Sequence, residues 1–235
     1  MPVKKPRGRK RPSHRRAYLS LLLLVILAGS SITYIYLNGY FPSGNSATST
    51  NVATTGPGCS ISPPATNGDA YVCVNTSLGS FEVELFSSAT PKTVANFLNL
   101  TKAGFYNQLV WHRIEPGFVI QTGDPSTKNG GGNRSTWGEN SSGVYIPFED
   151  DPNLHNYAGY LGMASTGARV GGSSQFYINL VDNSASLDGK YAVFGKVVDG
   201  MTVVTRIGSV KVEQVGGQNE PVIPIFINTI TILRS

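Results

Sequence analysis

The feature that most constrains the fold is a series of short strand-like segments between residues 69 and 235, separated by turns rich in Gly, Pro and Asn. In residues 80–86, Phe81, Val83 and Leu85 alternate with two glutamates, and this period of two is typical of a half-buried strand. Strands are expected at residues 70–76, 80–86, 109–114, 117–122, 175–181, 191–198 and 222–232.

Two segments have helical patterns instead. Thr90 is a favourable N-cap and Pro91 a favourable first helical residue, the apolar residues that follow fall on one face, and Gly104 can end the helix. Residues 201–207 form the second helical segment. Many short strands with two helices predict a mainly β domain, either a barrel or a two-layer β fold.

The positive charge is concentrated at the N-terminus. Eight of the 19 Lys and Arg residues lie in residues 1–16, whereas all 14 acidic residues lie at Asp69 or later. The rest of the chain therefore has 11 basic and 14 acidic residues, a net charge of about −3. A nucleic-acid-binding domain would have its basic residues on the folded part of the chain. The net negative charge of residues 69–235 therefore argues against this function.

Residues 17–37 carry no charge and are mostly apolar, and about 20 such residues can span a bilayer core. The basic residues before them predict a cytoplasmic N-terminus. A cleaved signal peptide is the alternative, which the lack of a clear Ala-x-Ala site disfavours. We expect a transmembrane helix at 17–37, and thus a single-pass cell-membrane protein whose domain lies outside the cytoplasm.

Residues 38–68 also carry no charge and are dominated by Ser, Thr, Asn, Gly, Ala and Pro, so we expect a flexible linker. Cys59 lies in this linker and Cys73 in the first predicted strand. Outside the cytoplasm a disulfide between them is permitted, and two unpaired thiols are the alternative. The expected order is a basic arm at 1–16, the anchor, the linker and a domain at 69–235.

The residues with chemical potential lie in two runs, 111–124 and 172–178. The first places one cation, Arg113, near one amide, Gln121, and the second adds another amide, Gln175, beside aromatic residues. The runs hold no nucleophile–base pair, carboxylate pair or metal cluster of the kind that hydrolysis or phosphoryl transfer needs. A cation with two neutral amides and an apolar wall suits a neutral peptide.

Both runs resemble the cyclophilin family of peptidyl-prolyl cis–trans isomerases, whose patterns are F-H-R-x-x-x-x-F-x-x-Q-x-G-D and G-S-Q-F-F-I. Residues 89–98, 161–164 and 187–197 match further family motifs in the same order, so the resemblance covers essentially all of the domain. It implies a closed eight-stranded antiparallel β-barrel capped by two α-helices, with the site on the outer wall. With the N-terminal anchor, the chain resembles bacterial membrane-anchored members.

The resemblance also implies roles for individual residues. Arg113 matches the catalytic arginine, and His112 is expected to be structural. The matched substrate-pocket positions are Phe118, Val119, Gln121, Ala164, Ser165, Gln175, Tyr177, Leu187 and Tyr191. No cofactor or metal is implied. The expected partners are proline-containing polypeptides and, through the N-terminal helix, the membrane, and the domain is expected to be monomeric.

The implied function is acceleration of X-Pro bond rotation in extracytoplasmic proteins, which assists their folding. A tethered proline-peptide binding module or chaperone without significant turnover is the alternative. The chain departs from the family pattern at the pocket rim: Ser186 replaces a common Trp, Tyr191 a common His and Ser165 a common Asn, and the loop after Asp124 is longer. These changes are expected to alter the binding of cyclosporin-type ligands.

Overall fold

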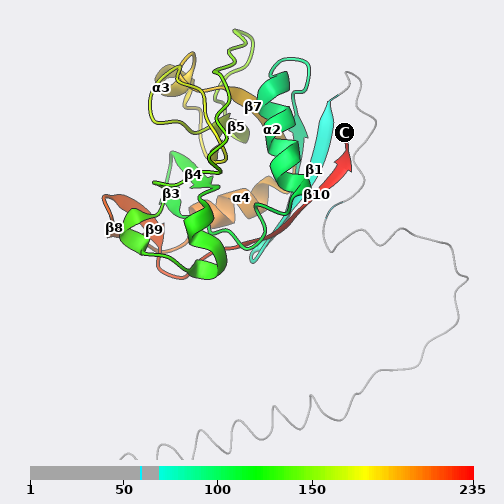
Figure 1. The fold of residues 1–235 in the computed structure, drawn as a ribbon. Helices are drawn as coiled ribbons and strands as arrows, with labels where there is room; N and C mark the ends of the chain where they lie inside the picture. Colours follow the sequence, from blue (N-terminus) through cyan, green and yellow to red (C-terminus); the bar gives the residue numbers. More distant parts are fainter. Residues whose placement is uncertain (1–58, 60–68) are drawn as a thin grey trace, which may run out of the picture. The chain divides into compact units, whose positions relative to one another are not determined.

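The computed structural model describes Cys59 and residues 69–235, whose strands form an eight-stranded antiparallel sheet and a separate hairpin (Figure 1). The hydrogen-bonded order of the large sheet is β10-β1-β2-β7-β5-β6-β4-β3, and the hairpin is β8-β9. In chain order the elements are β1 (Ala70–Thr76), β2 (Gly79–Leu85), α2 (Pro91–Lys102), β3 (Arg113–Glu115), β4 (Val119–Thr122), the 3₁₀ helices η1 (Pro125–Gly130) and η2 (Arg134–Thr136), β5 (Tyr160–Met163), β6 (Phe176–Asn179), α3 (Ser184–Leu187), β7 (Val193–Asp199), α4 (Met201–Gly208), β8 (Val212–Val215), β9 (Gln218–Pro221) and β10 (Ile227–Arg234).

The sheet is curled, but it is not the closed barrel that the sequence predicted. Its order begins at β10 and ends at β3, and the gap between these ends is bridged by irregular backbone bonds, such as Trp111 N–H to the Ile225 carbonyl at 2.9 Å. Gln108 has a φ of 65° on one side of the gap, and Pro224 lacks an N–H on the other. Both features interrupt a regular ladder.

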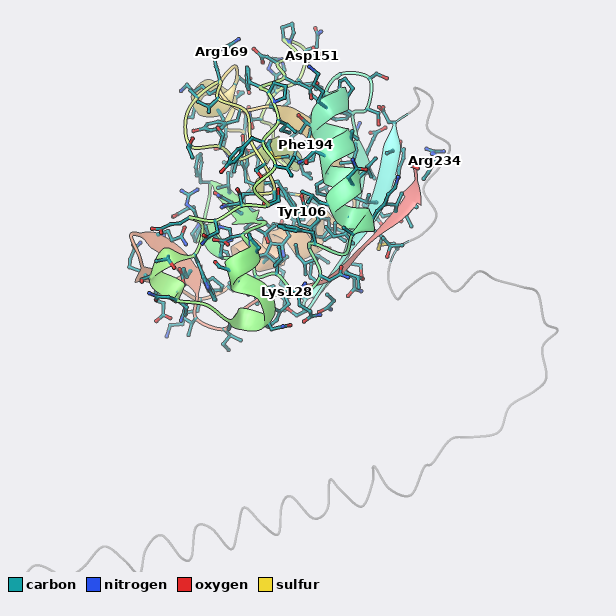
Figure 2. All side chains as sticks on the ribbon, viewed as in Figure 1. Tyr106, Lys128, Asp151, Arg169, Phe194 and Arg234 are labelled. Carbon is teal, nitrogen blue, oxygen red and sulfur yellow. A yellow bond between two sulfur atoms is a disulfide. The ribbon has the colours of Figure 1, made fainter. Side chains whose placement is uncertain are left out.

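A cluster of aromatic rings lies in the mostly aliphatic interior between the sheet and the helices. Phe97 from α2 contacts Tyr106, Phe176 and Phe194, with ring centroids 5.1 to 5.6 Å apart. All four side chains are buried, and Figure 2 labels Tyr106 and Phe194 in this interior. Tilted and edge-to-face contacts of this kind add about 0.5–1.5 kcal/mol per pair beyond the burial of apolar area. These contacts stabilise the packing of α2 against the inner face of the sheet.

The first turn of α2 is capped by a distant residue. Thr90 makes no side-chain capping bond; instead, Glu149 accepts from the backbone N–H groups of Lys92 at 3.1 Å and Thr93 at 2.7 Å. A carboxylate is favourable there because the helix N-terminus has unpaired N–H groups and a partial positive charge. Thr90 is the N-cap residue and the helix begins at Pro91, as the sequence predicted, but the side chain that caps the first turn is that of Glu149 and not that of Thr90.

The predicted anchor at residues 17–37 lies outside the described residues, as does the predicted linker apart from Cys59. Within the part of the chain that the structure describes, none of the helices has the length and apolar character needed to cross a bilayer.

Cys59 and Cys73 are joined by a disulfide, with their Cα atoms 6.0 Å apart. Cys73 lies in β1 between β2 and β10, and both cysteines are buried. The bond fastens the segment before the domain to the sheet.

Replacing both Cys59 and Cys73 with serine should lower the free energy of unfolding by about 3 kcal/mol, because the bond closes a loop of about 15 residues in the unfolded chain. Denaturant unfolding of the full chain, oxidised and serine-substituted, measures the difference. Equal stability of the two proteins, or two free thiols in oxidised protein by mass spectrometry, would contradict this expectation.

Candidate functional site

Strand register places the main candidate residues in one row across the sheet. Arg113 of β3 lies opposite Gln121 of β4, and Gln121 lies opposite Tyr177 of β6, which in turn lies opposite Gly162 of β5. Because side chains alternate along a strand, the next residues point to the other face. These neighbours are all buried in the core: Ile114, Ile120 and Phe176. The cation, the amide and the aromatic ring therefore lie side by side on the outer face.

The row borders a pocket of about 280 Å³. Its wall consists of residues that the sequence singled out, namely Arg113, Phe118, Val119, Gln121, Ala164, Ser165, Tyr177, Leu187 and Tyr191. The rings of Tyr177 and Tyr191 meet edge to face, with centroids 6.1 Å apart. Mostly apolar walls with one cation and one amide at the edge suit a small apolar ring that is attached to a peptide backbone.

Arg113 is held in place from two sides. Its Nη1 donates to Oε1 of Gln121 at 3.3 Å, and its Nε lies 3.3 Å from Oε1 of Glu115, two residues along the same strand. The Arg113 side chain is 30% exposed. Because the guanidinium is planar, these two contacts fix its orientation, and its other N–H groups can donate to a bound peptide.

Gln175 lies beside this pocket and not in its wall. It lines an adjoining pocket of about 230 Å³, and the two pockets share Gln121, Ala164 and Ser165. The Nε2 of Gln121 donates to Oε1 of Gln175 at 2.9 Å. The amides expected to contact substrate are thus joined in a chain that ends at Arg113.

The long segment after β4 supports this chain of amides. Gln175 Nε2 donates to the carbonyls of Gly138 at 2.8 Å and Asn140 at 2.6 Å. The backbone N–H groups of the same two residues donate to Oδ2 of the buried Asp124, at 2.6 and 3.2 Å. A buried carboxylate therefore fixes the loop that orients Gln175.

His112 is buried next to Arg113, and neither of its ring nitrogens has a hydrogen-bond partner of normal geometry among the described residues. Burial, together with the charge of Arg113, lowers the pKa of His112 to about 4, although the nearby Asp124, Val110 and Gln175 act in the opposite direction. The imidazole is therefore neutral near pH 7, and it cannot serve as a second cation beside Arg113.

Acid should destabilise the protein through His112. An unfolded histidine binds its proton near pH 6.5, whereas the folded one does so near pH 4, so stability falls as the pH drops between these values and is unaffected above them. At about 1.4 kcal/mol per pKa unit, the loss approaches roughly 3 kcal/mol. Denaturant unfolding at pH 7, 5.5 and 4 should show a smaller loss for His112→Gln than for wild type. An equal loss in both proteins would contradict the assignment.

Several residues of the site were missed by sequence reasoning. Gly162 lies opposite Tyr177, and Glu115 contacts Arg113. Asn156 accepts a hydrogen bond from the Tyr177 hydroxyl. Only Gly162 gave a usable signal, because a glycine inside an apolar strand segment often marks a close approach of another group. Neither Glu115 nor Asn156 has a local pattern that points to the pocket.

Comparison with known proteins gives concordant matches. The family model described as cyclophilin type peptidyl-prolyl cis-trans isomerase/CLD matches residues 71–232. The chain is 44% identical over 154 residues to peptidyl-prolyl cis-trans isomerase-like 1 of Aspergillus oryzae, covering 64% of this chain and 88% of that protein. It is 41% identical over 179 residues to peptidyl-prolyl isomerase CWC27 of Cryptococcus neoformans, covering 73% of this chain but 33% of that protein.

Solved structures give the same match. A cyclophilin type peptidyl-prolyl cis-trans isomerase of Cryptosporidium parvum is 32% identical, with a TM-score of 0.60, over 70% of this chain and 97% of its own. A crystal structure of that protein in the presence of the dipeptide Ala-Pro has a TM-score of 0.59 at 32% identity, over 69% of this chain and 98% of its own.

The location predicted from the sequence is wrong in the light of these relatives. The prediction was a membrane-anchored protein of bacterial type with its domain outside the cytoplasm, whereas the matched relatives are fungal proteins named isomerase-like 1 and CWC27. The prediction rested on residues 1–37, which lie outside both the family match and the described residues. The predicted location was therefore based only on the pattern of charge and hydropathy in these residues.

Proposed function

Because the chain belongs to the cyclophilin-type peptidyl-prolyl cis–trans isomerase family, we propose that its pocket binds X-Pro segments of polypeptides and that Arg113 accelerates their rotation, which assists protein folding. The observation that carries the proposal is the placement of an oriented guanidinium at the edge of a mostly apolar pocket of about 280 Å³. The proposal includes residues 69–235 as the isomerase domain and residues 38–68 as a linker.

The chemistry of the reaction explains why such a simple site suffices. Amide resonance gives the peptide bond a rotation barrier of about 18–20 kcal/mol, and uncatalysed X-Pro exchange takes tens to hundreds of seconds. No covalent bond is broken, so no nucleophile is required. As resonance is lost, the prolyl nitrogen becomes pyramidal and regains its lone pair. A donor that reaches this nitrogen stabilises the twisted state and not the planar ones, which is the differential binding that catalysis needs.

Arg113 is suited to be that donor. It is a permanent cation, and Gln121 and Glu115 orient it before substrate arrives, so little reorganisation is needed in the transition state. A 10⁵-fold acceleration would require about 7 kcal/mol of transition-state stabilisation. We assign the proline ring to Phe118, Val119, Tyr177 and Leu187, and the flanking peptide backbone to Gln121 and Gln175.

The test is an exchange measurement on the full wild-type chain. NMR exchange spectroscopy with a short X-Pro peptide should show faster cis–trans interconversion at catalytic protein concentrations. The solved relative crystallised with Ala-Pro supports the choice of a small proline peptide as the probe. If the peptide binds but its exchange is not accelerated, the protein is a binding module and not a catalyst. If the peptide neither binds nor exchanges faster, the assignment of the pocket is wrong.

A further inference from the structure

Behind the pocket wall lies a cluster of three buried asparagines, Asn156, Asn179 and Asn183. The hydroxyl of Tyr177 donates to Oδ1 of Asn156 at 2.8 Å, and Nδ2 of Asn179 donates to the same oxygen at 3.2 Å. Nδ2 of Asn183 donates to Oδ1 of Asn179 at 2.9 Å and to the carbonyl of Phe118 at 3.0 Å. The cluster thus connects two residues of the pocket wall, Tyr177 and Phe118.

Asp188 determines which end of the Asn156 amide faces Tyr177. Its Oδ1 accepts from the backbone N–H of Asn156 at 2.8 Å and from Nδ2 at 2.9 Å, and its Oδ2 lies 2.7 Å from Nδ1 of His155. Burial by itself would raise the pKa of Asp188, but the bonds from Asn156 and His155 outweigh it and hold the pKa below its usual value. An ionised carboxylate can only accept, so the nitrogen of Asn156 must face Asp188 and its oxygen must face Tyr177.

The same contacts join two walls of the pocket. Tyr177 lies on β6, whereas Leu187 ends α3 and immediately precedes Asp188. Asn156 bonds to both sides, through the Tyr177 hydroxyl and through the Asp188 carboxylate. The distance between the Tyr177 ring and the Leu187 side chain is therefore set by a fully buried residue that does not line the pocket itself.

We propose that Asn156 is a positioning residue for the proline socket, defined as Phe118, Val119, Tyr177 and Leu187. It holds the Tyr177 hydroxyl away from the socket, so that the side chain presents only its ring to the substrate. A buried hydroxyl without a partner is unfavourable, and without Asn156 the ring would turn this group toward the pocket, where water can reach it. The inference rests on the proposed function of the pocket.

A comparison with the family pattern explains why the Tyr177 hydroxyl needs Asn156 as an acceptor. The pattern has Phe where this chain has Tyr177, so the hydroxyl is an additional polar group at the back of an apolar socket. Burial raises the pKa of Tyr177 far above its usual value, which keeps the hydroxyl neutral and able to donate. Asn156 satisfies a group that a phenylalanine would not have introduced.

A double-mutant cycle between Asn156 and Tyr177 tests the proposal. In the full chain, Asn156→Ala should raise KM for an X-Pro peptide by about tenfold and lower kcat by less than about threefold, because Arg113 is untouched. In a Tyr177→Phe background the same substitution should change KM by less than about threefold, since there is no hydroxyl left to misplace. NMR exchange rates and peptide titration give both quantities.

Asn153→Ala is the matched control, because Asn153 is exposed and also bonds an aspartate, Asp151, without contacting the socket. It should leave KM unchanged. If Asn156→Ala does not fold, Asp188→Ala tests the same link from the more exposed side and should show the same dependence on the Tyr177 hydroxyl.

Equal increases in KM in the wild-type and Tyr177→Phe backgrounds, or a loss of thermal stability with unchanged KM, would overturn the positioning role. Failure of the proposed function has a different signature. In that case, the wild-type protein itself would neither bind the peptide nor accelerate its exchange.

Discussion

Replacing Arg113 with alanine should lower kcat/KM for an X-Pro peptide by roughly 10²–10³, equivalent to about 3–4 kcal/mol of lost transition-state stabilisation. Peptide binding should weaken far less, because the apolar socket remains. Arg113→Lys should be nearly as poor, since an ammonium group lacks the planar fork that Gln121 and Glu115 hold in place.

Tyr177→Ala is the matched opposite case, since it removes a wall of the socket and leaves the guanidinium. It should raise KM more than it lowers kcat. Thermal unfolding of Arg113→Ala should be close to that of wild type, because the side chain is 30% exposed and lies outside the core. Equal losses of peptide affinity and turnover in Arg113→Ala would show that the arginine only grips the substrate.

Gly162→Ala should impair peptide binding in the pocket, although Gly162 has no side chain that could contact the substrate. A Cβ atom at this position would overlap the Cζ and Oη atoms of Tyr177, whose ring lies directly across the glycine. The ring must then move toward the socket. We expect an increase in KM of more than about tenfold, together with a destabilisation of about 1–3 kcal/mol from overpacking.

Gly167→Ala is a suitable control for this substitution. A Cβ there would approach only the Val170 side chain, at 3.3 Å, and that side chain is exposed and can shift. Exchange kinetics and thermal unfolding of the two variants separate the effects. A Gly162→Ala protein with the wild-type KM would mean that Tyr177 does not form a wall of the substrate pocket.

The elements that could be predicted are those with local causes. The period of two at residues 80–86 corresponds to β2 at Gly79–Leu85, and the Thr90-Pro91 signal corresponds to α2 at Pro91–Lys102. Residues 109–114 were predicted as one strand, but only Arg113–Glu115 pair as β3, since the preceding residues bridge the gap in the sheet. Strand β5, the β8-β9 hairpin and the short α3 were missed, because each of these elements has only four residues per segment, too few to show a clear apolar period.

The candidate site shows the same division between local and distant causes. Family motifs pointed to the residues of the pocket wall, and the strand register explains why Arg113, Gln121 and Tyr177 come together. Most of the residues that support the fold around the site could not be predicted, because their contacts join segments far apart in sequence; Glu115, two residues from Arg113, is the exception, and it has no pattern that marks its role. Glu149 caps a helix 57 residues earlier, and Asn156 bonds to Asp188, 32 residues later.

The pairing of β1 with β10 places the two ends of the folded region next to each other. Tyr71 lies opposite Arg234, whose guanidinium stacks over the Tyr71 ring at 4.7 Å, and Figure 2 labels Arg234 on this last strand. Neither strand supplies a residue to the two pockets described above. A protein fused after Ser235 would therefore be attached beside the polypeptide that enters at Asp69, on strands that line neither pocket. Cargo joined at either end of the folded region would share one attachment point, away from the residues that line both pockets.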